Sequence, residues 1–224
     1  MDDLTCSGEV VHQTLREIDT INRLLGGNSV TIEGIRSLLT QNSAQGPLHI
    51  LDIGCGSGDM LKLVHQELNN GSVLIETTGL DANPHIIAYA QENCQAFAGM
   101  SFFTENVLEA PFRKRDADIV TATLFLHHFT NDQLVEILKT LVRQVRVGIV
   151  INDLHRHPLA YYGIKLLTQF FSSSSMVRYD APLSVLRGFT RKEWVELLRK
   201  AGITIYSLKW RWAFRWQVII RISE

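Results

Sequence analysis

The chain has 224 residues, which is enough for one α/β domain with a large buried core. Its 22 basic and 23 acidic residues leave a formal net charge of -1, so no bulk electrostatic field would gather nucleic acid or anionic lipid. The chain starts with acidic residues where a secretory signal is basic, and no apolar run approaches the roughly 20 residues that cross a bilayer. These features predict a cytoplasmic protein with no stable membrane insertion and no nucleic-acid partner.

The three cysteines, Cys6, Cys55 and Cys94, are odd in number and lack the paired spacing of metal ligands. This usage argues against a disulfide framework and against a structural zinc site. We therefore interpret the cysteines as reduced thiols and expect no bound metal.

Residues 10–39 carry apolar side chains at helical intervals, interrupted by Gly26-Gly27-Asn28, and this pattern predicts two or three short helices. Residues 1–46 are interpreted as an N-terminal helical cap and residues 47–224 as the main domain. We expect the two parts to form one structural domain.

The α/β core begins at residues 48–53, a short apolar run that stops at a glycine cluster, as a buried parallel strand does. Further strands are predicted at residues 73–81, 100–103, 117–123 and 147–152. Helices are predicted at residues 60–68, 84–98 and 132–141, the last capped by Asn131 or Asp132. Such alternation implies a parallel sheet with helices on both faces and ligands outside the carboxyl ends of the strands.

The C-terminal third departs from this alternation. Residues 158–172 indicate an apolar helical insert, residues 190–201 a helix that Gly202 ends, and residues 203–223 strand structure. Aromatic residues at positions 210, 212, 214 and 216 alternate with Arg211, Ala213 and Arg215, the period of a strand with one aromatic and one mainly polar face. We expect a closing antiparallel hairpin.

The glycine loop at residues 54–58 joins a predicted strand to a predicted helix. Its glycines supply tight dihedral angles and let a ligand approach the backbone without a Cβ clash. The spacing is G-x-G-x-G, which differs from the G-x-G-x-x-G of dinucleotide-binding folds. Asp81 ends the next strand, where its carboxylate is placed to bind two ribose hydroxyls. An ordinary turn, with Asp81 as a helix N-cap, is the alternative.

Here the chain resembles class I S-adenosylmethionine-dependent methyltransferases. Residues 51–59 match the family's first motif, Asp81 matches its ribose-binding acid, and residues 118–129 resemble its fourth motif with a Leu-His-His-Phe ending. The resemblance covers residues 48–202. It implies a Rossmann-like α/β fold with a mainly parallel seven-stranded sheet and a C-terminal antiparallel hairpin. It also implies S-adenosylmethionine as cofactor and S-adenosylhomocysteine as product.

The resemblance also indicates which residues hold the cofactor. The family often has an aspartate that contacts adenine, followed by a Pro-Phe pair, and this chain has Asn106 and Pro111-Phe112 there. The amide oxygen of Asn106 is still able to accept a hydrogen bond from the adenine amino group. The residues expected to bind the cofactor are Asp52, Gly54, Cys55, Gly56, Gly58, Asp81, Ala82, Asn106, Val107 and Thr123.

Methyl transfer to a hydroxyl or an acidic carbon needs an aligned nucleophile and a base that removes its proton. Histidine suits this task because its ordinary pKa is near neutrality. His155 is the first choice of base, followed by His127 and His157, whereas His128 is interpreted as structural. Asn152-Asp153 resembles the metal site of catechol methyltransferases, but the fourth motif offers no companion ligand, so we predict no metal.

Residues 155–189 are interpreted as a substrate cover, similar to the one that follows the fifth strand in ubiquinone/menaquinone-biosynthesis-like methyltransferases. Arg156 is expected to position an anionic or phenolate oxygen, or to pair with Asp153. Aromatic residues of the cover either wall the substrate or pack in the core, and the tryptophan-rich hairpin indicates core or the surface of a homodimer. The residues expected to bind substrate are Arg156, Tyr161, Tyr162 and Arg187.

The function that these patterns favour is methylation of a small hydrophobic or aromatic acceptor, with O-methylation of a phenol or hydroxyl in secondary or quinone-like metabolism ahead of the alternatives. Carbon methylation of a quinol or polyketide-like acceptor is the close alternative. A cofactor-binding interaction protein without turnover is a second alternative. A nicotinamide oxidoreductase is disfavoured by the glycine spacing, and a nucleic-acid or protein methyltransferase by the balanced charge and the apolar cover.

Overall fold

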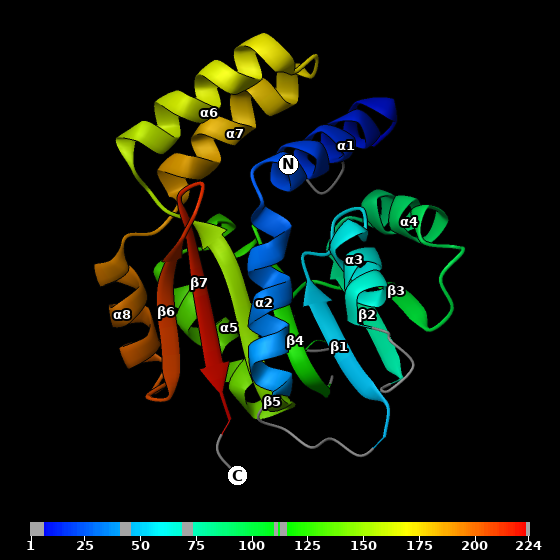
Figure 1. The fold of residues 1–224 in the computed structure, drawn as a ribbon, viewed down its shortest axis with the longest axis vertical. Coiled ribbons are helices and arrows are strands. Elements are labelled where there is room, and N and C mark those ends of the chain that lie inside the picture. Colours follow the sequence, from blue (N-terminus) through cyan, green and yellow to red (C-terminus); the bar gives the residue numbers. More distant parts are fainter. Residues whose placement is uncertain (1–6, 41–45, 69–73, 110–111, 113–115, 223–224) are drawn as a thin grey trace.

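The computed structural model describes residues 7–40, 46–68, 74–109, 112 and 116–222. Cys6, the Asn69-Asn70-Gly71 turn and Pro111 lie outside this part of the chain. A seven-stranded sheet forms the centre, helices cover both faces, and further helices close the edge at which the parallel strands end (Figure 1). No helix among the described residues is long and apolar enough to cross a membrane.

The strand order is β3-β2-β1-β4-β5-β7-β6, with β1 to β5 parallel and β7 antiparallel to both of its neighbours. This confirms the predicted mainly parallel sheet and its antiparallel hairpin. The order reverses between β1 and β4, which is where open α/β sheets bind ligands. The strands are β1 (Leu48–Ile53), β2 (Ile75–Asp81), β3 (Met100–Thr104), β4 (Ala117–Thr123), β5 (Val145–Leu154), β6 (Tyr206–Arg211) and β7 (Arg215–Arg221).

Helices pack on both faces because the inner strands are apolar on both sides; Ile50 and Leu51 of β1 are fully buried against opposite helix layers. The helices of one face are α2 (Gly27–Leu39), α3 (Asp59–Leu68) and α4 (Pro84–Asn93), and those of the other are α5 (Asn131–Gln144) and α8 (Arg191–Lys200). The prediction for α4 ran five residues too far. The predicted cap of α5 was wrong: Thr130 caps the helix, in a capping box with Gln133.

A roof of three helices lies above the carboxyl ends of the strands (Figure 1). It consists of α1 (Glu9–Leu24), α6 (Pro158–Phe171) and α7 (Ser175–Arg187), and the hydroxyls of Thr14 and Ser174 join α1 to α7 at 3.1 Å. Residues 10–39 form two helices, but only α1 belongs to the roof. Helix α2 packs on the sheet, where Ile35 is fully buried.

Helix α7 was missed by the sequence analysis. Pro182 lies inside the helix, and its apolar residues do not follow a clear helical period. Its stability therefore comes from packing against α6 and α1 rather than from local propensity.

The hairpin between β6 and β7 turns at Trp212-Ala213-Phe214, and Ala213 and Phe214 have φ angles of 60° and 55°. Such angles fit the twist of a tight hairpin but are strained for residues with a Cβ atom. The predicted alternation of aromatic residues crosses this turn, so a single aromatic strand face was wrong. Trp210 and Trp216 instead oppose each other on neighbouring strands, the first 48% exposed and the second 6%.

Candidate active site

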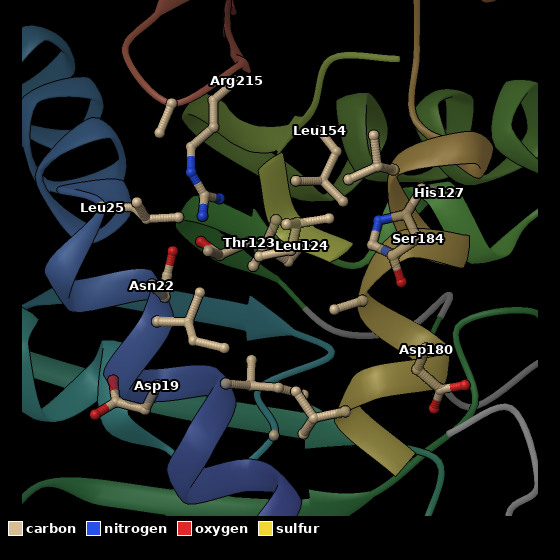
Figure 2. Close-up of a pocket in the computed structure, with 18 of the residues that line it drawn as sticks. Asp19, Asn22, Leu25, Thr123, Leu124, His127, Leu154, Asp180, Ser184 and Arg215 are labelled. Carbon is tan, nitrogen blue, oxygen red and sulfur yellow. The ribbon is translucent and has the colours of Figure 1, made fainter. Parts of the chain in front are cut away.

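A cavity of about 490 Å³ lies beneath the roof, at the carboxyl ends of β1, β4 and β5. The glycine loop forms one side of it, and α1, α6, α7 and the hairpin turn form the others. Figure 2 shows side chains such as Asn22 of α1, Ser184 of α7 and Arg215 at the hairpin converging on one space. The cavity is therefore where the structure brings the predicted ligand edge and the predicted cover together.

The glycine loop needs its glycines for conformation and for space. Gly54, Gly56 and Gly58 have φ angles of 67°, 52° and 77°, which favour glycine. A Cβ atom on Gly54 would lie 2.1 Å from the ring of Phe125, whereas one on Gly56 would meet only Leu15, at 3.7 Å. The loop is packed tightly from behind at Gly54 and leaves its backbone accessible at Gly56. That arrangement fits a cofactor lying against the backbone.

Asp52 is buried beneath this loop and accepts a 2.6 Å hydrogen bond from the hydroxyl of Thr121. Burial raises the pKa of Asp52 to about 7, the Thr121 hydrogen bond opposes the rise, and the charge of Asp81 adds to it. Asp52 lines the cavity. A cationic group placed beside it would favour its ionised form.

Asp81 ends β2, next to the strand that leads into the glycine loop, and does not itself line the cavity. Burial raises its pKa, and backbone N–H groups of Asn83, Gly56 and Ala82 oppose the rise. The Asn83 N–H donates to Oδ1 of Asp81 at 3.0 Å. Ala82 contributes its backbone N–H to the same carboxylate. A ligand that spans from Asp81 to Asp52 crosses only one strand spacing, about 5 Å, because β2 and β1 are neighbours. A ribose at Asp81 and a sulfonium near Asp52 therefore fit these residues.

The other residues expected to bind the cofactor differ in position. Thr123 lines the cavity and shares a 2.9 Å hydrogen bond with Thr31. Val107 is buried in the core, and the side-chain oxygen of Asn106 accepts from the N–H of Leu108 at 3.0 Å, so it is already partly engaged. Cys55 lines the cavity, but burial raises the pKa of its thiol well above the ordinary value, which leaves it unreactive.

His127 faces the cavity and forms a buried pair with Asp153. The Nδ1 atom donates to Oδ1 of Asp153 at 2.7 Å, and the backbone N–H groups of Leu126 and His127 donate to Oδ2 at 2.8 and 3.2 Å. Burial raises the pKa of Asp153, but the charge and hydrogen bonds of His127 outweigh it and hold the pKa below its usual range. Nε2 of His127 is buried with no hydrogen-bond partner among the described residues. The pair therefore holds the His127 ring in one orientation, with the Nε2 atom left unpaired in the wall of the cavity.

The structure places His155 and His157 outside the cavity lining. The ring of His155 packs against Trp216, with centroids 5.0 Å apart, and His157 stacks on Phe214, also at 5.0 Å. His157 also caps α6. Both rings follow β5 as predicted, but the hairpin covers them, and of the three histidines considered as base only His127 lines the cavity among the described residues.

The residues expected to bind substrate are mostly directed elsewhere. Arg156 forms an ion pair with Glu193 rather than with Asp153. Tyr161 and Tyr162 do not line the cavity, because α6 turns the opposite face toward it. Arg187 does line it. The residues that α6 contributes are Leu159, Ala160, Gly163, Ile164 and Leu167.

Sequence reasoning missed several polar side chains of the cavity, among them Asp19 and Asn22 from α1, Asp180 and Ser184 from α7, and Arg215 from β7. Arg215 is only 3% exposed, and Figure 2 shows it reaching from the hairpin toward Thr123 and Asn22. Its alternation with tryptophans indicated the polar face of a terminal strand. Only the position of β7 beside β5 reveals that this face is buried.

Asn152 and Asp153 have structural partners. The amide of Asn152 donates to the carbonyl of Gly27 at 2.8 Å, which ties β5 to the start of α2. Among the described residues there is no cluster of three or more His, Cys, Asp or Glu residues that could hold a metal ion.

Comparisons with known proteins agree with this geometry. Residues 50–148 match the family described as Methyltransferase domain. A comparison with curated protein sequences found no match. The structure of the plantazolicin methyltransferase BpumL in complex with a triazolic desmethylPZN analog and SAH has a TM-score of 0.68 at 17% identity, over 96% of this chain and 90% of that one.

Two other solved structures are similar at low identity. Magnesium protoporphyrin IX methyltransferase (ChlM) from Synechocystis PCC 6803, with bound SAH, has a TM-score of 0.59 at 15% identity, over 90% of this chain and 84% of that one. The CMeT domain of the citrinin polyketide synthase has a TM-score of 0.60 at 18% identity, over 80% of this chain. The present chain spans about half, 47%, of the latter chain.

The strand order and the similar solved structures define a class I methyltransferase fold. Residues 50–148, which include the glycine loop and His127, match the methyltransferase domain family.

Proposed function

We propose that this protein transfers the methyl group of S-adenosylmethionine to a small, largely apolar acceptor held under the roof, with O-methylation of a phenol or hydroxyl as the preferred reaction. The observation that carries the proposal is the His127–Asp153 pair at the wall of a cavity that begins at the glycine loop. The cofactor supplies an electrophilic methyl group on a sulfonium.

His127 supplies the base. Asp153 accepts the Nδ1 proton, which leaves the lone pair of the neutral ring on Nε2, an unpaired atom of a side chain that lines the cavity. Nε2 of His127 would take the proton of the acceptor hydroxyl, and the bound cofactor would supply the methyl group that this oxygen receives, with S-adenosylhomocysteine as the leaving group. Asp153 stabilises the imidazolium that results, because its carboxylate is held by backbone N–H groups and cannot turn away.

The remaining cavity walls select the acceptor by size and polarity. Leucine, isoleucine and valine side chains of α1, α6 and α7 line most of the roof side, which favours an apolar or aromatic acceptor. The volume of about 490 Å³ admits a small molecule and no folded protein segment. These walls also exclude water from the sulfonium, which suppresses hydrolysis.

The first experiment is calorimetric titration with S-adenosylhomocysteine, run beside NAD and beside Asp81→Ala. We expect micromolar binding of S-adenosylhomocysteine, a loss of about tenfold or more in the variant because a charged hydrogen-bond acceptor is removed, and no binding of NAD. Absence of S-adenosylhomocysteine binding to the folded wild-type protein would remove the proposed function.

Turnover is then tested with radiolabelled S-adenosylmethionine and a panel of phenols, quinols and β-dicarbonyl compounds. Mass spectrometry of the labelled product assigns the methyl group to oxygen or carbon. Tight cofactor binding without turnover on any acceptor, together with full binding in His127→Gln, would favour the cofactor-binding interaction protein instead.

A further inference from the structure

Arg215 is a cation buried in the wall of the cavity. It is the first residue of β7, opposite Leu154 in the register with β5, and 3% of it is exposed. Figure 2 shows the guanidinium pointing into the space between the glycine-loop side and the roof, toward Thr123 and Asn22. The chain therefore places a full positive charge inside a mostly apolar cavity.

This guanidinium has unused donors. Nε and Nη1 of Arg215 are buried with no hydrogen-bond partner, and Arg215 forms no ion pair among the described residues. Burial lowers the pKa of Arg215 to about 10, an effect that the charge of Asp153 opposes, so the group stays charged at neutral pH. A buried charge without partners is costly to a fold.

Asp153 does not provide the missing partner. Its carboxylate already accepts hydrogen bonds from the backbone of residues 126, 127 and 154 and from the ring of His127. It acts on Arg215 only through its charge. Arg215 lines the cavity with its Nε and Nη1 donors unpaired, so an anion that enters beside it is the partner that the fold does not supply.

The surroundings of Arg215 leave room for it and favour an anion. A Cβ atom on Gly27 would lie 2.7 Å from Cζ of Arg215, so the glycine makes space for the guanidinium. Gly27 also begins α2, whose 13 residues direct the positive end of a helix dipole toward the same region. Two positive fields therefore converge on one side of the cavity.

We propose that Arg215 binds a carboxylate group of the methyl acceptor, so that the acceptor is an apolar or aromatic acid rather than a neutral molecule. The planar fork of arginine matches the two oxygens of a carboxylate. This inference rests on the proposed function, because only a methyltransferase would bind the carboxylate as part of a methyl acceptor.

The cofactor also has a carboxylate, at its amino-acid end, and the charges of the cavity separate the two sources. Asp52 and Asp59 on the glycine-loop side, with Asp19 of α1 near Asp59, suit the ammonium and sulfonium of the cofactor. The strand that carries Arg215, β7, is separated from β1 by β5 and β4, although the side chain reaches back toward Thr123 at the end of β4. The strand order favours the acceptor, and the effect of Arg215→Met on S-adenosylhomocysteine affinity distinguishes the two carboxylates.

The test uses pairs of probes that differ only in charge: benzoate and benzamide, 2-naphthoate and 2-naphthamide, octanoate and octanamide. Each is titrated by calorimetry into protein saturated with S-adenosylhomocysteine. We expect at least one carboxylate to bind about tenfold or more tightly than its amide. Arg215→Met abolishes this preference and leaves the affinity for the amide and for S-adenosylhomocysteine unchanged, whereas Arg215→Lys retains part of it.

The matched control is Arg211→Met. Arg211 lies opposite Arg215 in the same hairpin, but it pairs with Glu33 and does not line the cavity. We expect the control to keep the carboxylate preference. Because Arg215 is an unpaired buried charge, Arg215→Met also leaves the melting temperature of the ligand-free protein unchanged or raises it by a few degrees.

Three results would overturn the proposal. One is equal affinity of wild-type protein for carboxylates and amides in every pair. Another is a loss of S-adenosylhomocysteine affinity in Arg215→Met, which would assign Arg215 to the cofactor. A third is a fall in melting temperature well beyond that of the control, with carboxylate preference intact in Arg215→Lys and Arg215→Met. If wild-type protein fails to bind S-adenosylhomocysteine, only the proposed function is overturned. Titration of the same carboxylate and amide pairs into the protein without S-adenosylhomocysteine then still tests the anion site.

Discussion

The glycine-loop side and the roof side of the cavity differ in how they are built. The first, residues 52–58 with Asp81, is polar, buried and fixed by hydrogen bonds such as that from Thr121 to Asp52. The second, made of α1, α6 and α7, is mostly apolar toward the cavity, with Asp19, Asn22, Asp180, Ser184 and Arg187 as polar members, and contacts such as that between Thr14 and Ser174 join its helices. A rigid site suits a cofactor that never changes, and an adaptable apolar one suits an acceptor that varies between relatives.

The largest expected effect is on the rate of methyl transfer, and it comes from the proposed base, His127, rather than from either side of the cavity. His127→Gln lowers the rate of methyl transfer by about 100- to 10,000-fold, because the proton acceptor is lost. S-adenosylhomocysteine affinity, measured by calorimetry, stays within about twofold. The control is His155→Gln, since His155 packs outside the cavity lining and its loss leaves the rate near that of wild type. Equal losses in both variants would contradict this assignment.

The next largest effect is the pH dependence of the free energy of unfolding, which protonation of Asp52 controls. Its pKa is about 7 in the folded protein against an ordinary 3.8, so between pH 4 and pH 7 the folded state holds a proton that the unfolded state has released. The free energy of unfolding therefore falls as pH rises, by about 1.4 kcal/mol per unit from this group and about 4 kcal/mol in all. Urea unfolding at several pH values checks this. In Asp52→Asn this part of the slope disappears; an unchanged slope would refute the shift.

A glycine comparison tests the rigidity of the two sides directly. Gly54→Ala costs about 2–4 kcal/mol of unfolding free energy, because its φ is 67° and the new Cβ meets Phe125. Gly163→Ala in α6 instead adds about 0.5–1 kcal/mol, since it lies in a helix with nothing within 4 Å. Urea unfolding at pH 7 measures both. Similar losses at the two positions would show that the roof is packed as tightly as the loop.

The smallest effect concerns the link within the roof. Thr14→Val removes the hydroxyl that meets Ser174 and costs about 1 kcal/mol, measured by urea unfolding. Thr20→Val is the matched control on the same helix, because the hydroxyl of Thr20 is exposed and contacts only a carbonyl of its own helix. We expect the control to change stability by less than about 0.5 kcal/mol. A larger loss of unfolding free energy in Thr20→Val than in Thr14→Val would show that the Thr14–Ser174 hydrogen bond does not stabilise the roof.

The same contrast explains what the sequence could predict. The glycine loop and Asp81 are local patterns whose dihedral and charge requirements are legible in a few residues, and the structure holds them at the edge of the sheet as expected. The strands were predicted because buried parallel strands are continuous apolar runs. Boundaries were less certain, as the overlong α4 shows.

The side chains that face the cavity from the roof were not predicted, because tertiary packing rather than local sequence determines which ones do so. Which histidine faces the cavity depends on where the hairpin lies, and the hairpin covers His155 and His157 while leaving His127 at the wall. The sequence pattern placed Arg215 on the polar face of a strand, because nothing local distinguishes a buried strand end from an exposed one. Helix α7, with an internal proline, carries no clear amphipathic pattern.

The position of β7 has a consequence for how the protein is made. This last strand in chain order, Arg215–Arg221, lies between β5 and β6 and pairs with β5 over residues 148–154. During synthesis on a ribosome the edge of β5 stays open until these residues emerge, and an open apolar strand edge is a site of aggregation. Arg215 arrives with the same strand. The pairing of β7 with β5 thus covers this edge and brings Arg215 into the cavity wall in a single step.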